Sequence, residues 1–207
     1  MRYARFVTGV TVSLLAVLVT RAGAAESPQE MIQTTVQQTL AVLRDPAYQG
    51  KARRAERAAK VKDLVLPHFD MQDLAARTLG PYWSQLTASQ RQEFVPLVSD
   101  LVERSYDATI DQYAQEVQLI YDQQRVGGSF AEVDTRVLVP TTGRSLSLDY
   151  FLHLVNGQWL IYDVQIDNVS LAMNYRNQFS RIISASSFGD LVQRIKDKLR
   201  DADRAST

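Results

Sequence analysis

The spacing of apolar residues changes twice along this chain, and this change limits the fold more than any other feature of the sequence. From Pro28 to Tyr113 the apolar residues recur every three to four positions, which is the period of amphipathic helices. From Val117 to Ile166 the period is two, which is typical of strands. The helical period returns after Leu171. Helices before and after consecutive strands predict an α+β fold, in which both groups of helices pack on an antiparallel sheet.

Local signals place the helix ends. Two capping boxes, in which Ser or Thr is followed three positions later by Glu or Gln, predict helix starts at Ser27 and Thr87. Pro67 ends the helix before it, because the residue before a proline avoids the helical conformation. Pro96 lies inside the longest run and predicts a bend there. The predicted helices cover about 28–44, 51–66, 70–79 and 88–113, and after the sheet about 171–182 and 188–199.

One hairpin turn predicts a strand register. Asn156-Gly157 is the preferred two-residue hairpin turn, so Val155 is expected to pair with Gln158. Counting outward from this pair places Tyr150 opposite Asp163, because strand side chains alternate between the two faces. Both faces of this hairpin are largely apolar. We therefore expect both faces to be covered, at least in part.

The first residues have the three-part layout of a secretory signal peptide. A short basic start is followed by the apolar run Phe6–Thr20 and by the small residues Ala22-Gly23-Ala24-Ala25. The apolar run is shorter than the roughly 20 residues of a spanning helix. Cleavage after Ala24 or Ala25 is expected. The predicted organisation is a signal peptide over 1–24 and a single domain over 25–207.

Composition excludes several classes of function. The chain has no cysteine, which excludes disulfides, thiolate metal sites and a lipidated cysteine, and its 2 histidines are too few for a histidine metal cluster. Loss of Arg2, Arg5 and Arg21 with the leader changes the balance of 23 basic and 23 acidic residues to a small acidic excess. That balance argues against nucleic-acid binding, which needs a strong positive field. We predict neither a metal nor a cofactor.

A catalytic site is not evident, and we predict that the chain is not an enzyme. His68 and His153 have no partner recognisable in the sequence, and no nucleophile, phosphate-loop or zinc-protease motif is present. One alternative is an isomerase-type enzyme on a cone-shaped α+β fold, with Asp163 and Tyr150 transferring a proton. The structural alternative places Asp163 at the rim of the sheet, bonded to the backbone or to an arginine such as Arg176.

The second predicted helix has a basic side. Arg53, Arg57 and Lys60 lie on one stripe, opposite the apolar residues of the same helix. Such a stripe is most often the solvated face of a helix. It can also contact acidic proteins or anionic lipid headgroups.

A set of short strings stands out by its order and spacing: Leu79-Gly80-Pro81-Tyr82-Trp83, Gly157-Gln158-Trp159, Tyr162-Asp163-Val164, Val169-Ser170-Leu171 and Tyr175-Arg176-Asn177-Gln178-Phe179. These strings resemble the MlaC family of periplasmic phospholipid-binding proteins, which are also described as toluene-tolerance proteins. The resemblance extends from about Pro28 to Leu199. Before Val169 the family usually carries Glu-Gly, whereas this chain has Asp167-Asn168; Asn tolerates a positive φ, so the turn is expected to survive.

The resemblance implies a function and a fold in more detail. It implies a soluble carrier in the periplasm that exchanges phospholipid between an outer-membrane lipoprotein–porin complex and an inner-membrane ABC transporter complex. The pathway maintains the lipid asymmetry of the outer membrane. The implied fold is a curved, NTF2-like antiparallel sheet with helices packed on it, and an apolar cavity between them holds the acyl chains.

Physical chemistry explains why a carrier needs such a cavity. Two acyl chains have about 30 methylenes, and transfer of each into water costs about 0.8 kcal/mol, so unaided desorption costs on the order of 20 kcal/mol. A dry apolar interior must return most of that free energy. The predicted lining residues are apolar side chains of one sheet face and of the long helix: Val102, Tyr106, Ile110, Val133, Val137, Leu148, Tyr150, Leu152 and Ile161.

Overall fold

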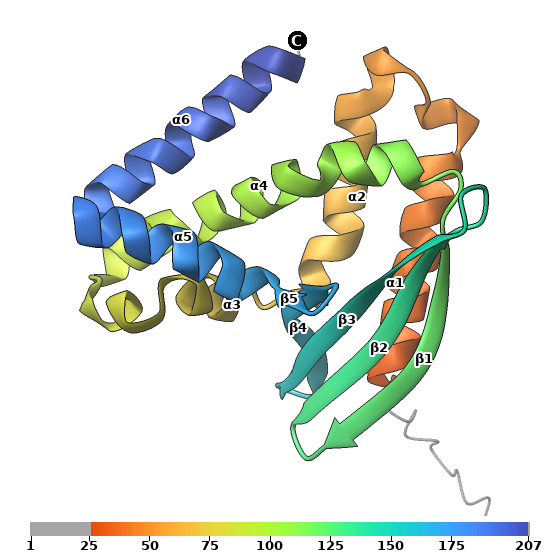
Figure 1. Ribbon diagram of the computed structural model, residues 1–207, viewed down its shortest axis with the longest axis horizontal. Coiled ribbons are helices and arrows are strands. Elements are labelled where there is room, and N and C mark those ends of the chain that lie inside the picture. The colour runs from red at the N-terminus through yellow and green to blue at the C-terminus, as the bar shows by residue number, and fades with distance from the viewer. Residues whose placement is uncertain (1–25, 207) are drawn as a thin grey trace, which may run out of the picture.

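The computed structural model of the chain describes residues 26–206, and of residues 106–113, 205 and 206 it describes the backbone alone. The predicted signal peptide over 1–24 lies outside the described residues. Figure 1 shows the elements in their spatial arrangement. They are α1 (Pro28–Arg44), α2 (Arg54–Val65), α3 (Met71–Leu79), α4 (Ala88–Tyr113), β1 (Gln118–Gly127), β2 (Phe130–Val139), β3 (Arg144–Val155), β4 (Gln158–Ile166), β5 (Val169–Ser170), α5 (Leu171–Ala185) and α6 (Phe188–Ser206), with short 3-10 turns between the first helices.

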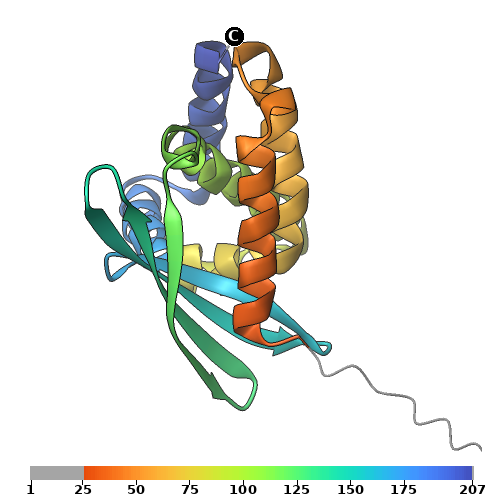
Figure 2. The same cartoon turned by 90° about the vertical axis from the view of Figure 1, so that its right-hand side faces the viewer.

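The predicted α+β architecture is confirmed. The strands form one antiparallel sheet of 5 strands in the order β1-β2-β3-β4-β5, so that each strand pairs with its neighbour in sequence. The sheet is twisted and curved, and α1 runs along one of its sides (Figure 2). In Figure 1, α3, α5 and α6 gather at the other end of the molecule, and α4 reaches from them to the start of β1.

The predicted caps and turns are present. Ser27 and Glu30 form the first capping box, with the Glu30 N–H donating to Ser27 Oγ at 3.2 Å and the Ser27 N–H donating to Glu30 Oε2 at 3.0 Å. Asn156 has a φ of 51° and Gly157 a φ of 82°, which is the backbone of the expected hairpin turn. The turn before β5 uses Asp167-Asn168, with φ values of 47° and 65°, so this turn survives the exchange. The sequence analysis missed β5, because two residues are too short to show a period.

The register of β3 and β4 corrects one prediction. The strands pair as expected next to the turn, but Tyr162 is an extra residue that forms a β-bulge. Tyr150 consequently pairs with Val164, whereas Asp163 pairs with Phe151 on the opposite face. The expectation that Tyr150 faces Asp163 was wrong, because one inserted residue moves every later side chain of the strand to the other face.

The sheet has an inner face, which α1 covers, and an outer face, which points away from α1. On the inner face, Met31 and Ile32 of α1 pack on Val133, Leu152 and Ile161. We call this group, with its remaining members, the sheet cluster. It also contains the buried residues Ala131 and Val164 and is flanked by Val36, Phe69, Tyr121, Leu148, Tyr150, Trp159 and Ile166.

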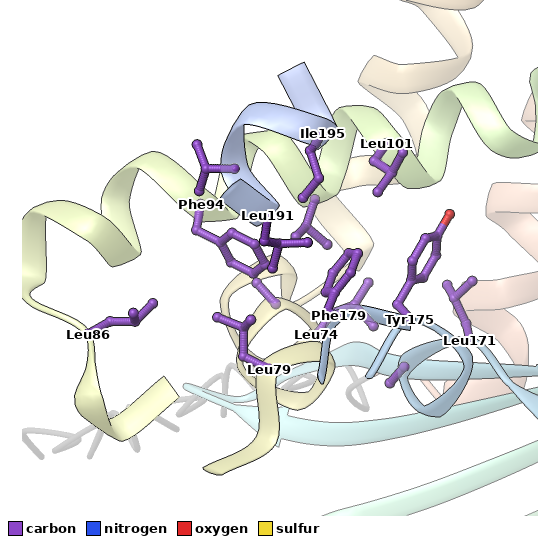
Figure 3. Packing of buried hydrophobic residues seen from close by; sticks show 14 residues of the cluster. Leu74, Leu79, Leu86, Phe94, Leu101, Leu171, Tyr175, Phe179, Leu191 and Ile195 are labelled. Carbon is purple, nitrogen blue, oxygen red and sulfur yellow. The ribbon is translucent and has the colours of Figure 1, made fainter. Parts of the chain in front are cut away.

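A second group of buried residues lies between helices α3, α4, α5 and α6, and we call it the helical cluster (Figure 3). Phe94 lies at its centre with no exposed surface, and its ring is 6.0 Å from that of Phe179 and 5.6 Å from that of Phe188. The molecule therefore has two hydrophobic clusters, one under the sheet and one among the helices.

Residues of the strings that resemble the MlaC family meet where the parts of the fold join. Gly80 has a φ of 55°, and a β-carbon at this position would collide with the guanidinium of Arg176 on α5. The Arg176 side chain is flexible and could move aside, so it is the positive φ that favours glycine at this position. Two residues farther along, the Tyr82 hydroxyl hydrogen-bonds to Ser184 Oγ at 2.9 Å. These contacts fix the turn after α3 against α5.

Candidate functional site

The sheet residues predicted to line a cavity share the inner face. Val133 pairs with Tyr150, and Leu152 pairs with Ile161, so each pair points to one side of the sheet. Val137 and Leu148 are in phase with these residues, because each lies an even number of positions from a paired residue on its own strand. Sequence periodicity thus identified a set of side chains that the structure brings together.

Burial divides these residues into two groups. Val133 and Leu152 have no exposed surface and Ile161 is 4% exposed, so α1 and the neighbouring strands already fill the space around them. Val137, Leu148 and Tyr150 are half-buried. With their neighbours on the same face they form what we call the half-covered strip: Leu119 and Tyr121 of β1, Val137 of β2, Leu146, Leu148 and Tyr150 of β3, and Ile166 of β4.

The sequence analysis missed Leu119, Tyr121, Leu146 and Ile166 of this strip. Leu146 has the same period as Leu148 and could have been included. Ile166 lies beyond the bulge at Tyr162, which moves it to the inner face. A second bulge, between Tyr121 and Gln123, interrupts the pairing of β1 with β2, so the period alone did not give the face of Leu119 and Tyr121.

The helical candidates have different positions. Val102 packs against the helical cluster, so the structure separates it from the sheet residues with which it was grouped. The reason is that the apolar stripe of α4 is wide and one side of it faces α3 and α6. Tyr106 and Ile110 lie later on α4 and closer in sequence to β1, but their side chains are outside the described part of the chain. Their contact with a ligand stays a prediction.

Two phenol groups give the half-covered strip its polar content. Burial raises the pKa of the Tyr121 hydroxyl to about 12. Burial also raises the pKa of Tyr150, and the nearby Tyr121 adds to this increase. Both shifts indicate surroundings that disfavour charge. A surface of aliphatic side chains with two neutral hydroxyls suits an apolar ligand better than it suits acid–base chemistry at neutral pH.

The Tyr121 hydroxyl is expected to titrate near pH 12, above its ordinary value of 10. In this window the folded protein keeps the proton that the unfolded chain loses, so the free energy of unfolding should fall as the pH rises above 10. The titration is measured as the difference in ultraviolet absorbance between the wild type and Tyr121→Phe. A Tyr121 step at pH 10 would show that this hydroxyl is solvated.

Asp163 has a structural role. Its Oδ1 accepts hydrogen bonds from the backbone N–H of Val164 at 2.9 Å and of Ala172 at 3.0 Å, and its Oδ2 accepts one from Ser170 Oγ at 2.5 Å. Ser170 is the N-cap residue of α5. The carboxylate therefore joins β4 to the first turn of α5, and the backbone-bonded alternative for Asp163 is the one observed. The proposed proton-transfer pair with Tyr150 is not formed, because the two side chains lie on opposite faces.

Two other side chains differ from expectation. His153, for which the sequence offered no partner, has its Nε2 3.1 Å from Oδ2 of Asp70, the N-cap of α3. Arg57 of the basic stripe is only 9% exposed and donates to the Tyr48 carbonyl at 2.6 Å. That stripe is therefore not one continuous solvated face, since its middle residue holds the turn after α1.

No helix among the described residues joins enough length to enough apolarity to cross a membrane. Within the same residues, no group of three or more His, Cys, Asp or Glu side chains has an arrangement suited to a metal ion.

Comparison with known proteins gives consistent results. The model of the MlaC protein family matches residues 33–197. The intermembrane phospholipid transport system binding protein MlaC of Haemophilus influenzae is 23% identical over 199 residues, which cover 93% of this chain and 92% of the relative. The structure of a phospholipid-binding protein from Ralstonia solanacearum, in complex with a phospholipid, superimposes with a TM-score of 0.75 at 23% identity, over 87% of this chain and 99% of the other.

Proposed function

The chain belongs to the MlaC family, and from this we propose that it is a periplasmic phospholipid carrier. In this proposal residues 1–24 direct export and are removed, and the domain exchanges phospholipid between an outer-membrane lipoprotein–porin complex and an inner-membrane ABC transporter complex. The exchange maintains the lipid asymmetry of the outer membrane.

The half-covered strip is the observation that carries the proposal. A fully packed core would bury these side chains as completely as Val133 and Leu152. Instead, aliphatic and tyrosyl side chains on β1, β2, β3 and β4 keep part of their surface open. Acyl chains that cover this surface would recover hydrophobic free energy at about 25 cal/mol per Å² of apolar area removed from water.

The relatives support the same reading. The R. solanacearum protein shares the fold and is described in complex with a phospholipid. The H. influenzae relative is named as the binding protein of an intermembrane phospholipid transport system. The isomerase alternative has lost its support, because it required Asp163 and Tyr150 on one face and the bulge at Tyr162 separates them.

Native mass spectrometry of the protein purified from cells tests the proposal. We expect a species heavier than the polypeptide by the mass of one or more phospholipids, and its melting temperature should fall after delipidation, because bound ligand stabilises the native state. A polypeptide that carries no lipid, and takes none up from phospholipid vesicles, would contradict the carrier function.

A further inference from the structure

The outer face of the sheet is open over β2 and β3, whereas α3 and α5 contact the outer side of β4. Its side chains alternate with the inner ones, and none of the outer-facing residues of these strands is in the buried class. Figures 1 and 2 agree that α1 lies against the opposite side. Phe130, at the start of β2, is 54% exposed, which is a large exposed fraction for an aromatic side chain.

Aromatic side chains gather on this face. The Tyr162 ring lies 6.3 Å from Phe130, 6.4 Å from Phe151 and 5.3 Å from the His153 ring. The guanidinium of Arg77, from α3, lies 4.1 Å from the centroid of the same ring. The bulge makes this group possible, because it adds Tyr162 to a row of outward-facing residues. Tyr, Phe and Arg are enriched where protein interfaces are most strongly bound.

Carboxylates border the aromatic group. Glu132, Asp134 and Asp149 share the outer face, and Arg125 bridges the first two at 2.7 Å each. Burial raises the pKa of Asp149, and repulsion from Asp134 and Glu132 adds to the increase, whereas the hydrogen bond from the Thr135 N–H and the nearby Arg125 oppose it. One guanidinium thus lies beside three carboxylates, which leaves negative charge that a further cation can meet.

A groove extends the same negative surface beyond His153. It is lined by two carboxylate residues and four others: Asp70, Asp73, Gln72, Ala76, Trp83 and His153. Asp70 Oδ1 accepts a hydrogen bond from the Asp73 N–H, and Asp73 Oδ2 accepts one from Arg77 Nε. A carboxylate has about four lone-pair positions, so each can accept another donor.

We propose that the outer patch, defined as Phe130, Glu132, Asp134, Asp149, Phe151 and Tyr162, docks the basic surface of a partner protein. The partner presents Lys or Arg side chains beside aliphatic or aromatic ones, so that cations meet the carboxylates while apolar groups cover Phe130. The inference rests on the proposed function, which supplies the two membrane complexes as the partners to test.

Charge selects this occupant over two others. An anionic bilayer surface would be repelled by the carboxylates. A second copy of the chain, in a symmetric dimer, would place the same acidic patch against itself. A basic protein surface is the occupant that can pair with the carboxylates for which Arg125 alone is too few, since one guanidinium lies beside Glu132, Asp134 and Asp149.

The test measures binding of the full mature protein to each purified membrane complex in nanodiscs, by biolayer interferometry. Glu132→Gln with Asp149→Asn removes two charges from the patch with little change of shape. Phe130→Ser removes the exposed ring. The matched control, Asp197→Asn with Asp201→Asn, removes two charges from the exposed side of α6. Phospholipid content by native mass spectrometry and the melting temperature are measured for every variant.

We expect each patch variant to bind at least one complex about tenfold more weakly, while the control binds as the wild type does. Lipid content should stay at the wild-type level in all of them, because none of these residues lies on the inner face. If the patch variants bind both complexes with unchanged affinity, the docking surface is elsewhere. Wild-type protein that binds neither complex would overturn both this inference and the proposed exchange partners. Wild-type protein that binds a complex but contains no phospholipid would overturn the carrier function instead.

Discussion

Leu148→Trp is expected to remove bound phospholipid without destabilising the lipid-free protein. Leu148 is half-buried in the middle of the half-covered strip, where the larger indole can occupy space that acyl chains would fill. We expect phospholipid occupancy to fall about tenfold or more, and the increase in melting temperature on lipid loading to disappear with it. The measurements are phospholipid content by mass spectrometry and the melting temperature before and after delipidation.

Leu152→Trp is the matched control, on the same strand and the same face. Leu152 has no exposed surface and packs with Ile161 and Val133 under α1. The same substitution should overpack this site and lower the free energy of unfolding of the lipid-free protein by about 1–3 kcal/mol. The difference between the two variants identifies the strip as the ligand surface. Equal loss of stability in both, with wild-type lipid occupancy per folded molecule, would place the ligand elsewhere.

Asp163→Ala is expected to lower the free energy of unfolding by about 2–4 kcal/mol, because it leaves two backbone N–H groups and the Ser170 hydroxyl without their acceptor. Urea unfolding followed by circular dichroism measures this loss. Asp163→Asn keeps one oxygen in place for the two N–H groups and should cost about 1 kcal/mol.

The same pair of variants distinguishes a structural from a catalytic aspartate. In the structural role, Asp163→Asn keeps nearly wild-type phospholipid binding, and only Asp163→Ala is strongly destabilised. If wild-type protein converted a small carbonyl substrate and Asp163→Asn did not, the enzyme alternative would be correct. An Asp163→Ala variant as stable as the wild type would show that the link between β4 and α5 contributes little.

The elements of the fold were predictable where the determining contacts are local. Ser27 and Glu30 are three residues apart, and the turn at Asn156-Gly157 depends on those two residues alone. The bulge at Tyr162 has no such signal in its own two or three residues. It brings Asp163 to the outer face, where the carboxylate accepts hydrogen bonds from Ser170 and Ala172 at the N-terminus of α5. Nothing next to Tyr162 in the sequence records that requirement.

The candidate site was predictable in part for the same reason. A period of two assigns Leu148 and Leu152 to one face, but it does not say which of them α1 covers. That difference arises from packing between segments more than a hundred residues apart in sequence. The position of Val102 was uncertain on similar grounds, because a wide helical stripe can face two neighbours, and the structure assigns it to the helical cluster.

The separation of the two hydrophobic clusters has a consequence under the proposed function, in which the protein is empty during part of each cycle. Cooperative units of a protein can open independently when few buried contacts connect them. Here Phe94 and its neighbours form one such unit, and α1 with Val133 and Leu152 forms another. The half-covered strip is completely buried in neither, so release of a bound phospholipid would remove contacts that neither unit needs to stay folded. A protein that works as proposed would then stay folded between the release of one lipid and the binding of the next.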